Sequence, residues 1–491
     1  MDKKIPTDSL TDKQKDYATF LPAMSSFFAR DLGKARHEED YILPKRVPQN
    51  FEHGVEGLNY MKPKDTYFYY KWHLYSAGHA DLNMKHFSVR DDIIRNRDRK
   101  DNWVLGDSGG FQIGKGVWEG DWKDPSCPKA KKKREQVLEF MDGNMDYGMI
   151  LDIPAWVSRS PQGAKASNIN SYQEAVDGTK INNDYFMKNR NGNCKFLNVL
   201  QGENFQQADD WYLQMKDYCD PKKYTDHFNG WAMGGQNMCD VHLALKRLVA
   251  LRFDGLLEKG KHDVMHFLGT SKLEWAVLLT DIQRAVRKYH NENFTVTFDC
   301  ASPFLATANG QIYCQLETNN RSKWVYRMVP SIDDKALAND TTLFGPAFVR
   351  EGKHHSFMDS PITAELQAKD ICIYGPGDLN KIGKEGKTSW DSFSYAIMMG
   401  HNVWMHINAV QEANRQYDNG VIPNMLVQEQ FDRVLFRDVV EAIFATDNKD
   451  EAEAVIKEFS RYWDTIIGTR GNTGKRITNA DTHFNNLFQE V

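Results

Sequence analysis

The central part of the chain alternates short apolar runs with longer amphipathic stretches. Each apolar run has the length of a β-strand and ends in an acidic, amide or glycine-rich tip. The runs are Trp103–Asp107, Tyr147–Asp152, Phe196–Leu200, Trp231–Met233, Val264–Leu268 and Phe294–Phe298. The stretches between them predict helices over Lys132–Met141, Tyr172–Lys188, Gln206–Tyr218, Val241–Phe253 and Leu273–Tyr289. This alternation predicts parallel βαβ units.

Repeated βαβ units of this kind indicate an α/β fold, and two architectures fit them. A doubly wound sheet places its site at one switch point, whereas a TIM (β/α)₈ barrel gathers every strand tip at one face. Because functional-looking tips follow nearly every strand, we favour the barrel and expect an active site at the carboxyl-terminal ends of its strands.

The flanking regions are less regular and predict additions to the barrel. Residues 1–60 are polar and interrupted by prolines, so we expect an N-terminal extension wrapped on the main domain. We expect the barrel domain over residues 61–415, with an insertion at about 304–386 after the last strand. Residues 416–491 predict C-terminal helices and a basic tail.

Several single elements follow from local composition in these flanking regions. Strand residues dominate Thr66–Trp72, and a short charged helix and loop is expected over Asp91–Lys100. A hairpin is predicted in the insertion, from Gly310–Cys314 and Trp324–Tyr326. Later helices are predicted over Ser389–Arg415, Met425–Ala445 and Glu451–Trp463.

Composition narrows the class of protein. With 41% hydrophobic and 26% charged residues among 491, the chain is globular in character. No apolar run approaches the roughly 18 to 20 residues that span a bilayer, no apolar leader is visible, and the seven cysteines are scattered. We therefore expect a cytoplasmic protein without membrane contact. The net charge of −5 means that any nucleic-acid contact must come from local basic segments.

Two strand tips carry carboxylates that suit glycosidic chemistry. At one face of a barrel, Asp107 and Asp299 could act on opposite sides of an anomeric carbon. One would attack and form a covalent glycosyl-enzyme, while the other would handle the proton of the leaving group. The alternative is that each aspartate only caps the following turn or helix. Five tips of matching character favour the chemical interpretation.

A set of motifs at these tips resembles the tRNA-guanine transglycosylase superfamily. The motifs are Asp107–Gln112, Leu200–Gly202, Ala232–Gly235, Phe267–Gly269 and Phe298–Pro303, and their order and spacing also match. They cover residues 103–303, and only together are they specific. The resemblance implies a TIM barrel that exchanges a guanine in nucleic acid for a 7-deazaguanine by a retaining double displacement.

The resemblance also implies roles for single residues. Asp299 would be the nucleophile at C1′, and Asp107 the general acid and base. Asp152 and Gln201 would hydrogen-bond the edge of the base, and Ser108 could contact the sugar or the incoming base. Gly234 and Gly235 would offer backbone groups to the exocyclic oxygen of the base. Phe111 and Leu268 would cover its two faces, as a flipped-out purine requires, although plain core packing is the alternative for both.

The motif for a metal is incomplete. Many members of the superfamily carry a Cys-x-Cys-x-x-Cys zinc site with a later histidine, but this chain offers only Cys372 and His406 near the matching places; His354, His355 and Asp378 could complete the set. Because a structural zinc needs four ligands, we expect no required cofactor and consider zinc doubtful. His406 is then expected to be a packed or hydrogen-bonded histidine.

Other features bear on which polymer is the substrate. The insertion, the N-terminal extension and the lack of a recognisable RNA-binding module resemble relatives that install 7-deazaguanines such as 7-cyano-7-deazaguanine in DNA, in bacteriophages and bacterial DNA-modification clusters. We therefore expect DNA as the partner, in the host cytoplasm if the protein is phage-encoded. Backbone contacts are expected from Lys131, Lys132, Lys133 and Arg134. Three alternatives stay open: a tRNA transglycosylase, a barrel glycoside hydrolase and a non-catalytic partner subunit.

Overall fold

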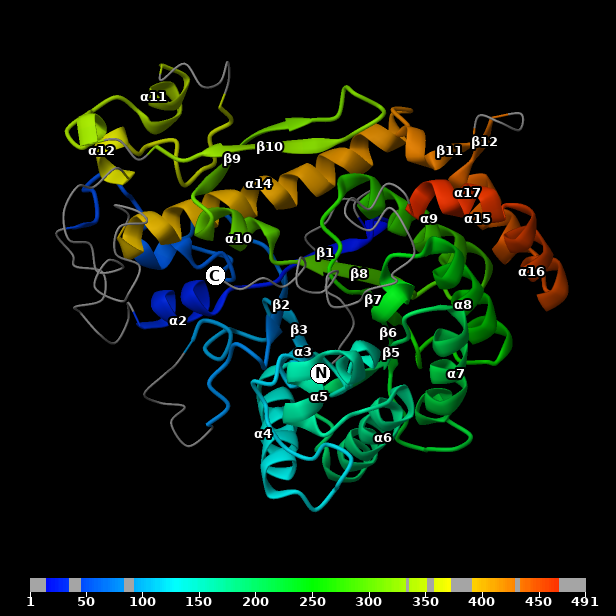
Figure 1. The fold of residues 1–491 in the computed structure, drawn as a ribbon. Helices are drawn as coiled ribbons and strands as arrows, with labels where there is room; N and C mark the ends of the chain where they lie inside the picture. Colours follow the sequence, from blue (N-terminus) through cyan, green and yellow to red (C-terminus); the bar gives the residue numbers. More distant parts are fainter. Residues whose placement is uncertain are drawn as a thin grey trace.

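Eight parallel strands form a sheet that curls into a nearly closed barrel (Figure 1). The computed structural model describes residues 15–34, 46–83, 92–332, 335–350, 357–371, 391–428 and 433–467. The strands are β1 (Thr19–Pro22), β2 (Trp72–Ser76), β3 (Trp103–Asp107), β4 (Tyr147–Met149), β5 (Lys195–Leu200), β6 (Gly230–Met233), β7 (Val264–Phe267) and β8 (Thr295–Cys300). Their order is β1-β8-β7-β6-β5-β4-β3-β2. The two end strands meet through a bridge between Ala23 and Leu74, where Met24 N–H donates to the Leu74 carbonyl at 3.0 Å.

Helices cover the outside of the sheet, so its strands are buried on both faces and read as continuous apolar runs. The covering helices are α4 (Pro128–Asn144), α6 (Tyr172–Asn189), α7 (Phe205–Met215), α8 (Val241–Phe253) and α9 (Leu273–Tyr289). The shorter helices α2 (Ser26–Lys34), α3 (Gly110–Gly114) and α5 (Pro161–Ser167) belong to the connections after β1, β3 and β4. The predicted bounds of α8 and α9 are confirmed, and the other three helices predicted between the strands, together with strands β3 to β8, lie within a few residues of their predicted ends. In the described part of the chain, no helix is long and apolar enough to cross a membrane.

The N-terminal region supplies a strand, which corrects the expectation of an irregular extension. β1 pairs with β8 in parallel, with Leu21 opposite Asp299. It is also held from outside the sheet, because Ala18 N–H donates to Thr280 Oγ1 at 3.0 Å and Tyr70 donates to the Phe20 carbonyl at 2.6 Å. Four residues that end in proline carry little strand signal of their own, and their pairing depends on a partner far along the chain.

The second strand begins later than predicted. The expected strand Thr66–Trp72 is wrong, since β2 starts only at Trp72. The aromatic residues before it pack side by side, with Phe51 and Tyr67 stacked at 4.4 Å and Tyr60 and Phe68 at 4.9 Å. The helix expected within Asp91–Lys100 is also absent from its described residues 92–100, which form turns.

After β8 the chain leaves the barrel and returns. Helix α10 (Ser302–Ala308) leads to the predicted hairpin, which is confirmed as antiparallel strands β9 (Gln311–Glu317) and β10 (Val325–Pro330). Short helices η7 (Lys335–Leu337), α11 (Phe344–Arg350) and α12 (Ala368–Ile371) follow. The long helix α14 (Ser392–Asp418) then crosses one side of the barrel next to this hairpin (Figure 1).

The C-terminal elements pack on the outer helices. The expected helix Met425–Ala445 is wrong in its first half, where a short turn and the small strands β11 (Val427–Gln428) and β12 (Val434–Leu435) precede α15 (Phe436–Ala445). Glu451–Trp463 is divided between α16 (Lys449–Glu458) and α17 (Ser460–Ile467). These helices lie beside α8 and α9 (Figure 1). The predicted basic tail, from Thr469 onward, lies outside the described residues.

Candidate active site

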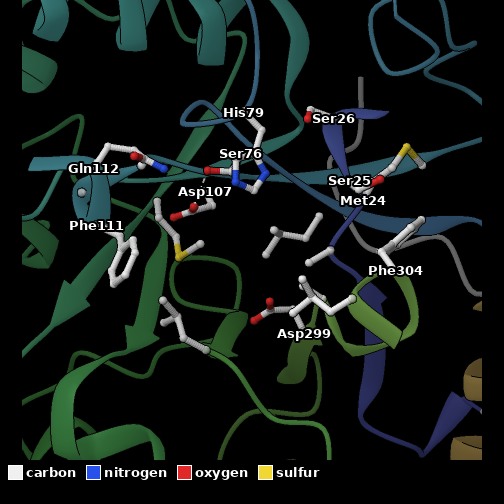
Figure 2. Close-up of a pocket in the computed structure, with 18 of the residues that line it drawn as sticks. Met24, Ser25, Ser26, Ser76, His79, Asp107, Phe111, Gln112, Asp299 and Phe304 are labelled. Carbon is white, nitrogen blue, oxygen red and sulfur yellow. Dashed lines mark hydrogen bonds between the residues drawn. The ribbon is translucent and has the colours of Figure 1, made fainter. Parts of the chain in front are cut away.

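A cavity of about 290 Å³ opens at the carboxyl-terminal ends of the strands. Its volume is at the lower end of the range for small-molecule sites. Eight of the residues predicted from the sequence line it, namely Asp107, Phe111, Asp152, Gln201, Gly234, Gly235, Leu268 and Asp299. Figure 2 shows the two aspartates between Phe111 and Gln112 on one side and Met24 and Phe304 on the other. The fold therefore brings together tips that are far apart in the sequence.

Asp107, at the end of β3, is held by groups that neighbour the cavity. Its Oδ2 accepts a hydrogen bond from Ser76 Oγ at 2.6 Å, and the two residues are paired across β2 and β3. Burial raises the pKa of the Asp107 carboxyl, and the nearby charge of Asp299 raises it further. Hydrogen bonds from Ser76 and the Gly109 backbone lower this pKa, and so does nearby His79. A carboxyl with a raised pKa is suited to carrying a proton at neutral pH.

Asp299, in β8, is more deeply buried and has different partners. Only 5% of the residue is exposed. Its Oδ1 accepts a hydrogen bond from the Gly269 N–H at 2.9 Å and lies 3.2 Å from His266 Nε2. His266 Nδ1 lies 2.9 Å from Thr297 Oγ1. Because a carboxylate oxygen accepts, the hydrogen bond to Asp299 is donated by the N–H at Nε2. These contacts fix the orientation of the carboxylate.

Asp152 and Gln201 form a polar edge in the cavity. Gln201 Nε2 donates to Asp152 Oδ2 at 2.7 Å. Burial is the main reason that the pKa of Asp152 is raised to about 7. The charge of Asp107 also raises this pKa, whereas the hydrogen bond from Gln201 lowers it. Gln201 Oε1 is buried and has no hydrogen-bond partner among the described residues. An unpaired buried acceptor next to a cavity suggests a ligand that donates a hydrogen bond there.

Glycines let the backbone approach this edge. Gly235 has φ +53°, and a Cβ built on it would lie 2.4 Å from the Gly202 carbonyl oxygen. At Gly109, φ is +77° and a Cβ would lie 2.7 Å from the Trp118 ring. Any side chain at these two positions would force the turns apart. Gly234 and Gly235 thus offer backbone at the cavity wall, as expected from their motif.

Apolar side chains supply the remaining walls on this side. Phe111, in α3, and Leu268, just after β7, both line the cavity and are partly exposed. Trp156 also lines it, and its ring lies 5.6 Å from that of Phe111 at an angle of 57°. Flat rings and an aliphatic side chain near an amide and carboxylate edge suit a planar heterocycle.

Two predicted residues are placed differently from expectation. Ser108 is 1% exposed and does not line the cavity, so the structure does not support a direct contact with sugar or base. Its hydroxyl has no partner among the described residues. Arg134 is also 1% exposed, and its Nε donates to Asn182 Oδ1 at 2.6 Å. It was predicted as a backbone contact because it continues a lysine run, but the helix turns it inward.

The three lysines before Arg134 stay at or near the surface. Lys131 and Lys132 are exposed on α4, and Lys133 is partly exposed with its Nζ 4.9 Å from the centre of the Trp118 ring. Through Trp118, this side of α4 is connected to the Gly109 turn at the cavity. Of the three lysines, Lys133 is thereby linked to the turn beside the cavity.

Sequence reasoning missed several residues of the site. Ser76 and His79 line the cavity beside Asp107, and Trp156 lines it elsewhere. Gln112 also lines it; it was part of the motif Asp107–Gln112 but had been given no role. His266 does not line it and acts on Asp299 from behind. The one available signal was a polar residue inside an apolar run, as His266 is in Val264–Leu268.

His406 is packed in the interior, where it stacks on Phe20 at 4.4 Å. Its Nε2 lies 3.2 Å from the Tyr326 hydroxyl and 3.6 Å from Cys300 Sγ, and burial lowers its pKa to about 3. The predicted partner Cys372 lies outside the described residues. Within the described ranges, no group of three or more histidine, cysteine or acidic side chains is arranged to hold a metal ion.

Comparison with known proteins does not assign the chain to a family. No protein-family model matches the sequence, and no curated protein is significantly similar to it. The resemblance to the transglycosylases therefore rests on the motif residues alone. The chemistry of the cavity has to be argued from its own geometry.

Proposed function

We propose that this protein is a base-exchange transglycosylase that replaces guanine in DNA with a 7-deazaguanine derivative, through a covalent link to Asp299. One observation carries the proposal: a single cavity collects Asp107 and Asp299 together with an apolar wall and the Asp152–Gln201 edge. In the same proposal, the nearly closed sheet is a modified (β/α)₈ barrel, in which the described part of the β2–β3 connection has no helix.

The proposed reaction has two displacement steps. In the first step, a carboxylate oxygen of Asp299 bonds to C1′ of the nucleotide, and the bond from C1′ to guanine N9 breaks. The leaving guanine takes the bond electrons and a proton from Asp107. In the second step, N9 of the incoming base displaces the Asp299 carboxylate from C1′ and gives its proton to Asp107. Two inversions at C1′ retain the configuration.

The base edge supports a guanine-like ligand. Guanine presents N–H donors and a carbonyl oxygen along one edge, so it needs acceptors and a donor from the protein. Asp152 and the unpaired Gln201 Oε1 supply the acceptors. The Gly235 N–H is the proposed donor to the carbonyl, because the N–H groups of Gly234 and Gln236 already donate to the carbonyls of Leu200 and Gly202 at 2.8 Å. The rings of Phe111 and Trp156 and the Leu268 side chain would cover the faces of the base.

Incorporation of labelled guanine into DNA or tRNA tests which nucleic acid is the substrate. Wild-type protein and Asp299→Asn would each be incubated with duplex DNA and, separately, with bulk tRNA. We expect label in DNA with wild type and none with the variant. Label in tRNA alone would establish the RNA alternative instead. Label in neither, with the protein folded, would leave the partner-subunit interpretation and contradict the proposed reaction.

A further inference from the structure

The segment between the cavity and α4 is locally basic. Residues 115–134 hold seven lysine or arginine residues against three acidic ones, although the whole chain carries a net charge of −5. Two of the lysines are already paired, Lys129 with Glu119 and Lys123 with Glu174, each at 2.8 Å, and Arg134 is buried. The segment contains a tight loop, Lys115–Trp118, which we call the rim loop. Positive charge at the entrance of a cavity favours a polyanion at that place.

The rim loop is held firmly against the cavity wall. The N–H groups of Val117 and Trp118 both donate to the carbonyl of Gln112, at 2.9 and 3.1 Å, and Gln112 lines the cavity. Gly116, with φ +72°, makes the turn. The Trp118 ring lies against Gly109, which lines the cavity, so the residue after Val117 packs on the cavity rim.

Val117 is the tip of this loop and points into solvent. It is 64% exposed, which is the largest value among the large hydrophobic residues of the described ranges. A single exposed valine is ordinary on a protein surface. This one lies on a fixed loop, beside a cavity of base-like dimensions, with Lys133 stacked on the next residue and Lys115 over Phe111 at 5.3 Å.

We propose that Val117 is a wedge that enters duplex DNA and fills the space left by the flipped-out guanine. This inference rests on the proposed function, since it concerns how a paired base reaches the same cavity. Extruding a base costs its pairing and stacking, and apolar side chains inserted between base steps offset that cost in other DNA-binding proteins. The surrounding lysines bind the flanking phosphates and hold the wedge in register.

Base exchange on paired and unpaired substrate tests the wedge. The substrates are a duplex with one target guanine and the same strand alone, and the variant is Val117→Ser. We expect exchange in the duplex to fall roughly tenfold or more, because extruding a stacked base costs a few kcal/mol. Exchange in the single strand stays within about twofold, since no base pair has to be opened.

Leu213→Ser is the matched control. Leu213 is 63% exposed, and it lies on α7 about 12 Å along the helix axis from the end nearest the cavity. We expect this control to exchange both substrates like wild type. Equal losses on the two substrates with Val117→Ser, or no loss on either, would overturn the wedge.

A second readout separates this inference from the proposed reaction. With 2-aminopurine placed next to the target guanine, extrusion of that guanine unstacks the probe and raises its fluorescence without any turnover. We expect the rise with wild type and a smaller one with Val117→Ser. Flipping without exchange of guanine would contradict the proposed function and leave the wedge standing. If guanine is exchanged but wild type and Val117→Ser flip the base equally, the proposed wedge is wrong and the proposed function is unaffected.

Discussion

Asp107 and Asp299 lie in one cavity, yet their surroundings differ in kind. Asp107 is oriented by a hydroxyl and a turn amide, through Ser76 and Gly109, and its pKa is raised by burial and by the second carboxylate. Asp299 is oriented by an imidazole and a backbone amide, through His266 and Gly269. The first arrangement suits a group that gains and loses a proton, and the second suits a group that must keep one orientation during attack.

This difference shows that the hydrogen-bonding partners of two chemically identical side chains can indicate different roles for them. A nucleophile benefits from donors that hold one carboxylate oxygen in place, leaving the other oxygen to react. A proton carrier benefits from burial and from a neighbouring negative charge. The following predictions are ordered from the largest expected effect to the smallest.

Replacing each aspartate by asparagine should separate the two roles. Asp299→Asn should lower exchange on the order of 10⁴-fold or more, because no oxygen remains to form the covalent bond. Asp107→Asn should lower it roughly 10²–10⁴-fold, because only the proton transfer is lost. Denaturing gels of protein with labelled DNA measure the adduct. A DNA adduct on Asp299→Asn would contradict the assignment, whereas a slowly formed adduct on Asp107→Asn would sharpen it.

Asp152→Asn should stabilise the protein at high pH. Asp152 has a pKa raised to about 7 in the folded state, so the folded protein holds a proton that the unfolded chain releases between about pH 4 and 7. Stability due to this group therefore falls as pH rises through that window. At pH 8, the variant should gain on the order of 2–4 kcal/mol in the free energy of unfolding, and near pH 4 almost nothing. Urea unfolding at the two pH values measures this.

Asp281→Asn is the control for that prediction. Burial also raises the pKa of Asp281 to about 7, against a hydrogen bond from Tyr417, but Asp281 lies on α9 and does not line the cavity. It should show the same sign of stability change and keep base exchange, whereas Asp152→Asn should lose much of it. If both variants lost exchange equally, the base-edge role of Asp152 would be wrong.

His266→Ala should slow covalent bond formation more than it affects binding. Losing a hydrogen bond to a charged group costs about 1.5–3 kcal/mol, so kcat should fall roughly 10–100-fold with little change in KM for DNA. His266→Gln keeps a donor for Asp299 and should recover most of the rate. Single-turnover adduct formation separates these outcomes. Equal losses in both variants would reduce His266 to a packing residue.

Ser76→Ala has the smallest expected effect; it removes the hydrogen bond to Asp107 and also the acceptor of the Gly78 N–H at 3.1 Å. The Ser76 hydroxyl opposes the rise in the Asp107 pKa, so its removal raises that pKa further. Because Asp107 must be protonated when guanine leaves, the loss of adduct formation at high pH should move upward, by up to about one pH unit. The pH–rate profile of single-turnover adduct formation is the measurement, and His266→Gln should leave the position of this limb unchanged.

The regular part of the fold was predictable because its signals are local. Strands β3 to β8 are apolar runs bounded by glycine or polar residues, and α8 and α9 have clear helical spacing. The same local character brought eight of the predicted residues to one cavity, because side chains at the carboxyl-terminal ends of parallel strands lie close together.

The remainder depends on contacts between distant residues. β1 is too short to identify without β8, and β2 was obscured by the aromatic residues that precede it. Arg134 was expected at the surface because its neighbours are lysines, but a position on the inner side of α4 buries it. Sequence spacing could not show that Ser76 contacts Asp107 or that His266 contacts Asp299, because each contact forms between neighbouring strands of the sheet.

The pairing of β1 with β8 also has a consequence for synthesis of the protein. Thr19 and its partner Thr297 are separated by about 280 residues, which a ribosome adds in roughly 15–60 s. Until then the edge of β1 that pairs with β8 has no partner. The nascent chain therefore exposes an apolar surface that can bind chaperones or lead to misfolding. Slow translation near β8 should therefore reduce the yield of folded protein more than an equal delay within the C-terminal helices.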